Sequence, residues 1–113
     1  MAAPIIDAAT FAELQESAGA DFVGELIDTF FEEAPTMLAE LRRASASPAA
    51  VAFRRAAHSL KSNANTFGAL ALGALARELE LGALDAGTVA GALTRLDEEY
   101  RGAAAALAEL RGG

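Results

Sequence analysis

The sequence predicts an all-α protein, an up-and-down antiparallel four-helix bundle with an additional short N-terminal helix. Three observations lead to this fold class. Apolar residues recur with the 3.6-residue period of an amphipathic helix in several segments of the chain. The stretches between these segments are short, so neighbouring helices should lie antiparallel. No segment alternates between apolar and polar residues over a useful length, as a half-buried strand would.

Two helices are predicted in the N-terminal part of the chain. Thr10-Phe-Ala-Glu13 has the pattern of a capping box that opens a short helix, and Gly19 is expected to end it. A second helix should start near Asp21. Pro35 lies inside this helix, where it removes a backbone hydrogen bond and is expected to bend the axis. The apolar face of the second helix consists of Val23, Leu26, Ile27, Phe30, Ala34, Met37, Leu38 and Leu41.

The third helix is expected to start at Ser47-Pro48, where a side-chain cap precedes a proline at the first helical position. It should run to about Asn65, and Gly68 is a typical residue for the turn that follows. One side of this helix gathers its apolar residues, which are Phe53, Ala56, Ala57, Leu60, Ala64 and Phe67.

A fourth helix is predicted over about residues 69 to 83, and Thr88 is expected to cap a fifth helix. The fifth helix has one apolar stripe, formed by Val89, Leu93, Leu96, Tyr100, Ala104 and Leu107. The larger side chains that we expect to be mostly buried in the bundle are Phe30, Leu38, Leu60, Leu75, Leu79, Leu96 and Tyr100.

Length and composition fit a single domain over residues 1–113, with the bundle core at about 20–110. The chain has 9 Lys and Arg against 16 Asp and Glu and a net charge of −7, which argues against nucleic acid as a partner. Apolar residues never form the run of about 20 that spans a bilayer, and no signal peptide is evident. We therefore expect no membrane partner and a cytoplasmic location.

The only histidine of the sequence is His58. At about 100° per residue it falls roughly 150° from the centre of the third helix's apolar cluster, so it should face solvent. The polar residues that share its face are Arg54, Arg55, Lys61, Ser62 and Asn65. Most of them can donate hydrogen bonds to an anion beside the imidazole. The alternative is that His58 is an ordinary surface residue.

Other histidine chemistries have weak support. With one histidine and no cysteine, the chain lacks the ligands of a zinc site, so no metal is expected. Ser59 and Ser62 flank His58, but no nucleophile elbow accompanies them. The chain has no glycine-rich phosphate-binding motif. If the imidazole carries a phosphoryl group, another protein must supply it.

The stretch His58-Ser-Leu60-Lys61-Ser62, followed by Gly68-Ala69, closely resembles the motif of the histidine-containing phosphotransfer (HPt) domain family. That pattern is H-x-L-K-G with a glycine ten positions beyond the histidine. The resemblance extends over about residues 20 to 110, through FFEEAP in the second helix and LARELE in the fourth. It implies that His58 is the phosphoacceptor and Lys61 the cation beside the phosphoryl group. Ser62 replaces the usual glycine and should tighten access.

The resemblance implies a phosphorelay intermediate of two-component signalling, without an ATP-binding or kinase domain of its own. It would accept a phosphoryl group from the aspartate of a receiver domain, or act with a hybrid histidine kinase, and pass the group to another receiver. Mg²⁺ would come from the receiver, since no cofactor is expected in this chain. We expect a monomer. Two alternatives stay open: a helical adaptor that binds a receiver or kinase without phosphotransfer, and a dimeric fragment like that of a histidine kinase.

Counting from the turn suggests which residues face His58 from the fourth helix. His58 lies ten residues before Gly68, so residues about ten after the turn should be level with it. Glu80 is the first choice for holding the far ring nitrogen and fixing the tautomer, and Arg77 is the second. Both could also be ordinary solvated residues. A second apolar stripe of the fourth helix packs on the first helix or a loop, or else docks a partner; it contains Leu70, Ala74, Leu81 and Leu84.

Overall fold

The computed structural model describes residues 5–47, 50–82 and 86–112, and it confirms the predicted all-α fold class. The described residues form five helices and no strand. The helices are α1 (Ala8–Ala18), α2 (Ala20–Arg43), α3 (Val51–Phe67), α4 (Leu70–Leu81) and α5 (Ala86–Gly112).

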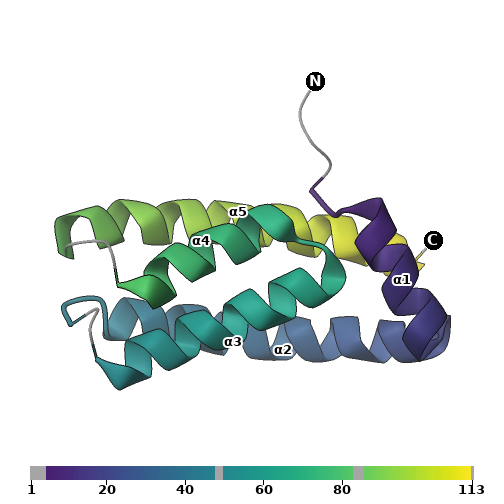
Figure 1. Ribbon diagram of the computed structural model, residues 1–113, viewed down its shortest axis with the longest axis horizontal. Coiled ribbons are helices and arrows are strands. Elements are labelled where there is room, and N and C mark those ends of the chain that lie inside the picture. Colours follow the sequence, from purple (N-terminus) through teal and green to yellow (C-terminus); the bar gives the residue numbers. More distant parts are fainter. Residues whose placement is uncertain (1–4, 48–49, 83–85, 113) are drawn as a thin grey trace.

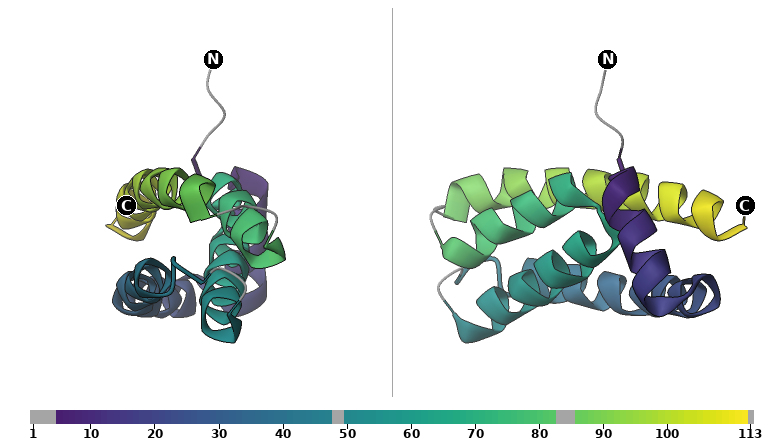
Figure 2. Two further views of the ribbon diagram at one scale, coloured as in Figure 1. Left: turned by 90° about the vertical axis from the view of Figure 1, so that its left-hand side faces the viewer. Right: turned by 45° about the vertical axis from the view of Figure 1, so that its right-hand side comes forward.

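Helices α2 to α5 form the up-and-down bundle, and each runs antiparallel to the next (Figure 1). α2 and α5 have 24 and 27 residues, whereas α3 and α4 have 17 and 12. The two long helices therefore extend past the turn between α3 and α4. α1 crosses the bundle at this end and packs on α2 and α3 (Figure 1 and Figure 2).

Gly68 shapes the turn between α3 and α4. Its φ of 86° lies in the left-handed region that side chains with a β-carbon rarely adopt. A β-carbon at this position would also lie 2.9 Å from the carbonyl oxygen of Asp7. The carbonyl of Gly68 accepts a 2.8 Å hydrogen bond from the backbone N–H of Asp7, so the start of α1 is attached to the turn.

The predicted capping box at Thr10 is wrong, because α1 already begins at Ala8 with Asp7 as its N-cap. The Asp7 carboxylate accepts hydrogen bonds from the hydroxyl (2.6 Å) and the backbone N–H (3.0 Å) of Thr10. These bonds favour the ionised carboxylate and hold the pKa of Asp7 below its usual value. A carboxylate three residues earlier thus takes the capping role. The predicted end of this helix at Gly19 is confirmed.

Two other predicted helix starts are also wrong. α3 begins at Val51, so Ser47 lies in the loop before it, where backbone hydrogen bonds form a turn. Pro48, the second residue of that predicted start, lies outside the described residues. Thr88 falls within the first turn of α5 and is not its cap, because the helix begins at Ala86.

Glycine residues end α3 and α4, and a proline lies inside α2. α4 ends at Leu81, earlier than the predicted residue 83, because Gly82 adopts a left-handed φ of 69°. Gly68 ends α3, as expected. Pro35 lies inside α2, which continues through it as one helix.

The buried side chains form one continuous hydrophobic cluster between the helices. The predicted burial is confirmed for Phe30, Leu38, Leu60, Leu75, Leu79 and Leu96. Tyr100 is only half-buried: its ring packs edge-on against Phe30 with centroids 5.7 Å apart, and its phenol lies at the boundary between core and water.

The second apolar stripe of α4 does not pack on α1 or on a loop. Leu70 and Leu81 are 49% and 61% exposed, and Ala74 is exposed between them. The packing interpretation is therefore wrong for these three residues, because α1 lies at the end of the bundle and leaves the outer side of α4 open. Leu84 lies outside the described residues.

Candidate functional site

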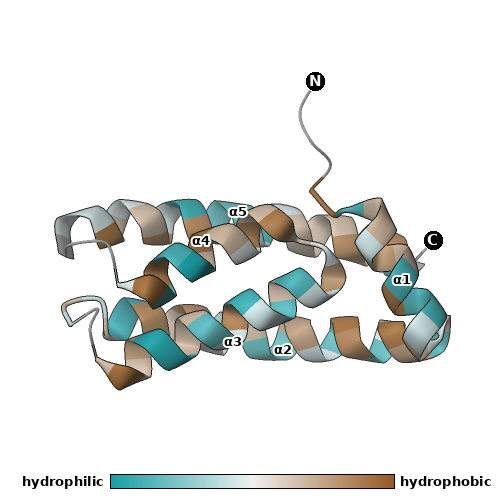
Figure 3. Ribbon diagram, in the orientation of Figure 1, coloured by the Kyte–Doolittle hydropathy of each residue, from teal (hydrophilic) through white to brown (hydrophobic). Residues whose placement is uncertain are grey.

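His58 projects from the solvent face of α3, as the helical wheel predicts. The whole predicted apolar cluster of this helix is buried, from Phe53 to Phe67. The His58 side chain is 58% exposed, and the outward side of α3 is mainly hydrophilic (Figure 3). Because so little of the imidazole contacts the core, its ring nitrogens are available to polar partners.

The fourth helix supplies the first of these partners. Nδ1 of His58 lies 2.7 Å from Oε2 of Glu80, which is hydrogen-bonding distance. Glu80 lies two residues beyond the position that is level with His58 across the Gly68 turn. This offset agrees with helix geometry, because side chains lean toward the N-terminus of their own helix and the two helices are antiparallel. The structure therefore places the first-choice residue of the sequence analysis against the ring.

Lys61 completes a cluster of three charged or titratable side chains. Its Nζ lies 2.7 Å from Oε1 of Glu80, so the carboxylate joins Lys61 through one oxygen and His58 through the other. The Glu80 side chain is 23% exposed, and its Oε1 is buried. The ammonium group of Lys61 therefore balances the negative charge of this oxygen. Hydrogen bonds from Lys61, and then from His58, hold the pKa of Glu80 below its usual value.

The cluster determines which ring nitrogen of His58 can react. An ionised carboxylate can only accept hydrogen bonds, so Glu80 requires a proton on Nδ1 of His58. In the neutral ring, Nε2 then carries the free electron pair. The arrangement holds Nδ1 in place and leaves Nε2 as the nitrogen that can act as a nucleophile.

The remaining predicted site residues of α3 are not part of this cluster of three side chains. The guanidinium of Arg54 reaches the C-terminal end of α4, where Nη2 would lie 3.3 Å from a β-carbon at Gly82. A cation is favourable there because the helix dipole is negative at that end. Asn65 turns its amide onto Gly73 of α4 and not toward His58. Ser62 is exposed, one helical turn after His58.

Arg77, the second choice for the ring contact, is exposed on α4 and has no ion-pair partner among the described residues. It lies one turn before Glu80 on the same helix, so it adds positive charge near the site without touching His58 in this structure. α3 itself contains no acidic residue, although the whole chain carries −7. The site is thus a local cationic surface on an acidic protein.

Sequence reasoning missed two features of the site. It placed Lys61 beside a phosphoryl group without its bond to Glu80, and it gave no role to Gly73. Gly73 is buried, and it lets the Asn65 side chain approach the α4 backbone. A glycine inside a helix is unfavourable, so its presence in ALALGALARELE could have indicated such a close approach.

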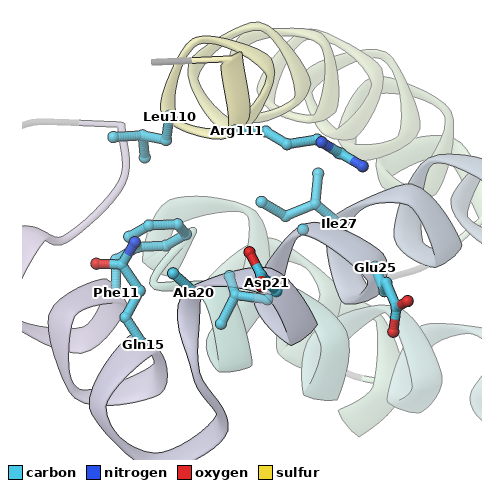
Figure 4. A pocket seen from close by; sticks show the side chains of 10 residues that line it. Phe11, Gln15, Ala20, Asp21, Glu25, Ile27, Leu110 and Arg111 are labelled. Atoms are coloured by element: carbon cyan, nitrogen blue, oxygen red, sulfur yellow. The ribbon is translucent and has the colours of Figure 1, made fainter.

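A pocket lies at the opposite end of the bundle, between α1, α2 and the end of α5 (Figure 4). It has a volume of about 520 Å³, and its lining includes Phe11, Ile27 and Arg111 but none of the His58 cluster. Arg111 forms a two-pronged ion pair with Asp28, with distances of 2.8 and 2.6 Å, which joins α5 to α2 near this pocket. The pocket therefore does not serve the imidazole chemistry.

Residues 5–47, 50–82 and 86–112 contain neither a candidate metal site nor a candidate membrane span. These residues contain no group of three or more metal-binding side chains that could hold an ion. None of the helices they form combines the length and the apolar character needed to cross a membrane.

Comparison with known proteins supplies an independent view of the chain. A family model described as the Hpt domain matches residues 25–112. Among solved structures, the chain is similar to the crystal structure of histidine-containing phosphotransfer protein B (HptB) from Pseudomonas aeruginosa PAO1. The two share 27% sequence identity with a TM-score of 0.85, over 98% of this chain and 97% of that one. No curated protein matches the sequence.

Proposed function

Because this chain belongs to the Hpt domain family and therefore has a histidine phosphotransfer role, we propose that His58 accepts a phosphoryl group from the aspartate of one receiver domain and passes it to another. The observation that carries this proposal is the 2.7 Å contact of His58 Nδ1 with Glu80 in a side chain that is 58% exposed, which leaves Nε2 as the nitrogen that can react. The chain would act as a carrier that takes its phosphoryl group from another protein.

The transfer step balances without a proton leaving the site. The electron pair of His58 Nε2 forms the N–P bond while the bond between phosphorus and the receiver's aspartate breaks, and its electrons return to that carboxylate. The ring then carries a positive charge together with the Nδ1 proton. Glu80 stabilises this charge, because its carboxylate already accepts the Nδ1 hydrogen bond at 2.7 Å. The reverse sequence returns the phosphoryl group to a second receiver.

Lys61 has two roles in this proposal. In the resting protein it neutralises the buried Oε1 of Glu80 and so fixes the direction of the other oxygen toward His58. An ammonium group has three donors, so Lys61 can keep this contact and still place positive charge beside the phosphoryl oxygens. Mg²⁺ and the phosphorylated aspartate are expected to come from the receiver.

The charge around His58 supports an acidic partner. Arg54 and Arg55 precede the histidine on α3, and Arg77 lies on the adjacent helix. A receiver that presents carboxylates around its phosphorylation site would meet a complementary surface here, which speeds association and orients the encounter. We propose that the chain binds such a receiver as a monomer, which a mass measurement in solution tests.

The replacement His58→Gln tests the proposed phosphoacceptor. We expect the variant to keep its helical circular dichroism, since the side chain is 58% exposed, and to lose all acid-labile phosphorylation by a phosphorylated receiver. Because His58 is the only histidine, residual phosphohistidine in the variant is impossible, so any label must be on another residue type. A wild-type chain that binds receivers but never becomes phosphorylated would instead support the adaptor alternative.

A further inference from the structure

We infer that the Ser62 hydroxyl donates a hydrogen bond to the phosphoryl group on His58, and that this bond helps to set how strongly the chain retains the group. The inference rests on the proposed function and extends it to a residue that is not needed for the attack itself. Ser62 would be a positioning residue whose bond exists only in the phosphorylated state.

The position of Ser62 on α3 suits this role. It lies four residues after His58, so the two side chains are neighbours on one helical face, with β-carbons about 5–6 Å apart. Side chains on a helix lean toward its N-terminus, so Ser62 leans toward the turn that carries His58. The Glu80 contact holds the Nδ1 side of the ring against α4, which leaves Nε2 on the open side of the site.

The Ser62 hydroxyl is also available. Exposed threonine hydroxyls elsewhere in the chain turn back onto the carbonyl four residues earlier, as Thr29, Thr66 and Thr94 do at 2.9–3.3 Å. Ser62 is exposed, and its hydroxyl makes no such bond and has no other partner among the described residues. It can therefore turn toward an added anion without giving up a bond within the protein.

Three other polar residues of this face already have a neighbour or a role of their own. Arg54 leans away from His58 and lies against the end of α4 at Gly82. Asn65 lies two turns away, with its amide against Gly73. Lys61 is paired with Glu80 at 2.7 Å and already has its own role beside the phosphoryl group. Ser62 is thus a nearby hydroxyl donor that gives up no existing bond when it turns toward the phosphoryl group.

A bond that forms only after phosphorylation must shift the phosphoryl equilibrium toward this chain. Net hydrogen-bond energies in water correspond to about a three- to tenfold change in an equilibrium constant. We expect Ser62→Ala to move the equilibrium between phosphorylated receiver and phosphorylated chain toward the receiver by that factor. Ser62→Thr keeps a hydroxyl and should stay within about twofold of the wild type.

The experiment measures this equilibrium with a receiver domain from the same genome, phosphorylated with acetyl phosphate and freed of the excess reagent. Phosphate-affinity gels give the final fraction of each phosphoprotein for the wild type, Ser62→Ala, Ser62→Gly and Ser62→Thr. Ser59→Ala is the matched control, because it removes a hydroxyl from another face of the same helix. A ³¹P NMR titration of each phosphorylated chain then reports the phosphoryl group directly, since a lost donor raises the pH at which the phosphoryl dianion takes up a proton.

The outcomes distinguish an effect of the Ser62 hydroxyl on the phosphoryl equilibrium from an effect of side-chain volume. The inference holds if Ser62→Ala and Ser62→Gly shift the equilibrium and the ³¹P titration alike, while Ser62→Thr and Ser59→Ala do not. It is overturned if Ser62→Ala matches the wild type in both measurements, or if only Ser62→Gly differs, because the β-carbon would then matter and not the hydroxyl. A wild-type chain that takes no phosphoryl group on His58 contradicts the proposed function itself.

Discussion

Replacing Glu80 by glutamine tests whether the chemistry depends on a fixed tautomer of His58. The carboxylate offers an acceptor to His58 and another to Lys61, each at 2.7 Å. An amide has one oxygen and one NH₂ group, so it can satisfy only one of these neighbours. If its oxygen faces the ammonium group, its NH₂ faces Nδ1 and favours the tautomer with the proton on Nε2. If the amide is reversed, two donors oppose each other at Lys61.

The exposure of the site limits how much this change costs. In the buried triads of serine proteases, exchanging the carboxylate that orients the histidine for an amide lowers the rate by about 10⁴-fold. Here the His58 side chain is 58% exposed and Glu80 is 23% exposed, so water can partly satisfy either tautomer. We therefore expect Glu80→Gln to slow phosphotransfer by about 10- to 100-fold at saturating receiver.

The assay combines transfer rates with a direct view of the ring. Single-turnover transfer from a phosphorylated receiver gives the rate, and ¹⁵N NMR gives the protonation state of each ring nitrogen. With one histidine in the chain, the ring produces a single pair of nitrogen resonances. Glu78→Gln serves as the matched control, since Glu78 is exposed on the same helix and forms no ion pair with either His58 or Lys61.

Two results would refute the reasoning. Transfer by Glu80→Gln within twofold of the wild type would show that the carboxylate is dispensable. A slow variant whose ring keeps its proton on Nδ1 would show that Glu80 acts by another route, such as receiver docking. Slow transfer together with a shift of the proton toward Nε2 supports the assignment.

Three further predictions concern the packing and the charges that support the site. Leu60→Ala should lower the free energy of unfolding by about 2–5 kcal/mol in urea denaturation, because Leu60 is 0% exposed; a loss below about half a kcal/mol would contradict the burial. Lys61→Ala should slow transfer by about 10- to 100-fold, and Lys61→Arg should restore part of the rate. A wild-type rate for Lys61→Ala would show that Lys61 has no part in the mechanism. Gly68→Ala should lower the melting temperature, since it combines a φ of 86° with a contact at 2.9 Å to the Asp7 carbonyl; an unchanged melting temperature would show that the turn relaxes at little cost.

The fold could be predicted from the sequence because each bundle helix repeats one apolar face over several turns. The helix starts were harder to predict, because several residues near each start can act as caps. Asp7 and Thr10 both have capping side chains, and the choice between them depends on the contact of α1 with the turn at Gly68. Such tertiary contacts are not visible in local sequence.

Some features of the candidate site could likewise be predicted from the sequence, and others could not. The exposure of His58 follows from the helical period, and the proximity of Glu80 follows from counting residues across a short turn. The pairing of Lys61 with Glu80 could not be predicted, because the long flexible side chain of Lys61 can reach several partners. Which partner lies near it depends on how the helices pack. The turn of Asn65 toward α4 depends in the same way on space that Gly73 leaves open.

The contact between His58 and Glu80 depends on the register of α3 against α4, and that register is set far from the imidazole. A shift of α4 by one residue would rotate it by about 100° and carry Glu80 away from the ring. Two features oppose such a shift: the left-handed Gly68 fixes the turn, and the Asp7 N–H holds the Gly68 carbonyl at 2.8 Å. α1 therefore contributes to the geometry of the site without touching it, because it holds in place the turn that sets the position of Glu80. A phosphoacceptor held by rigid helices in this way needs only small movements when a partner approaches.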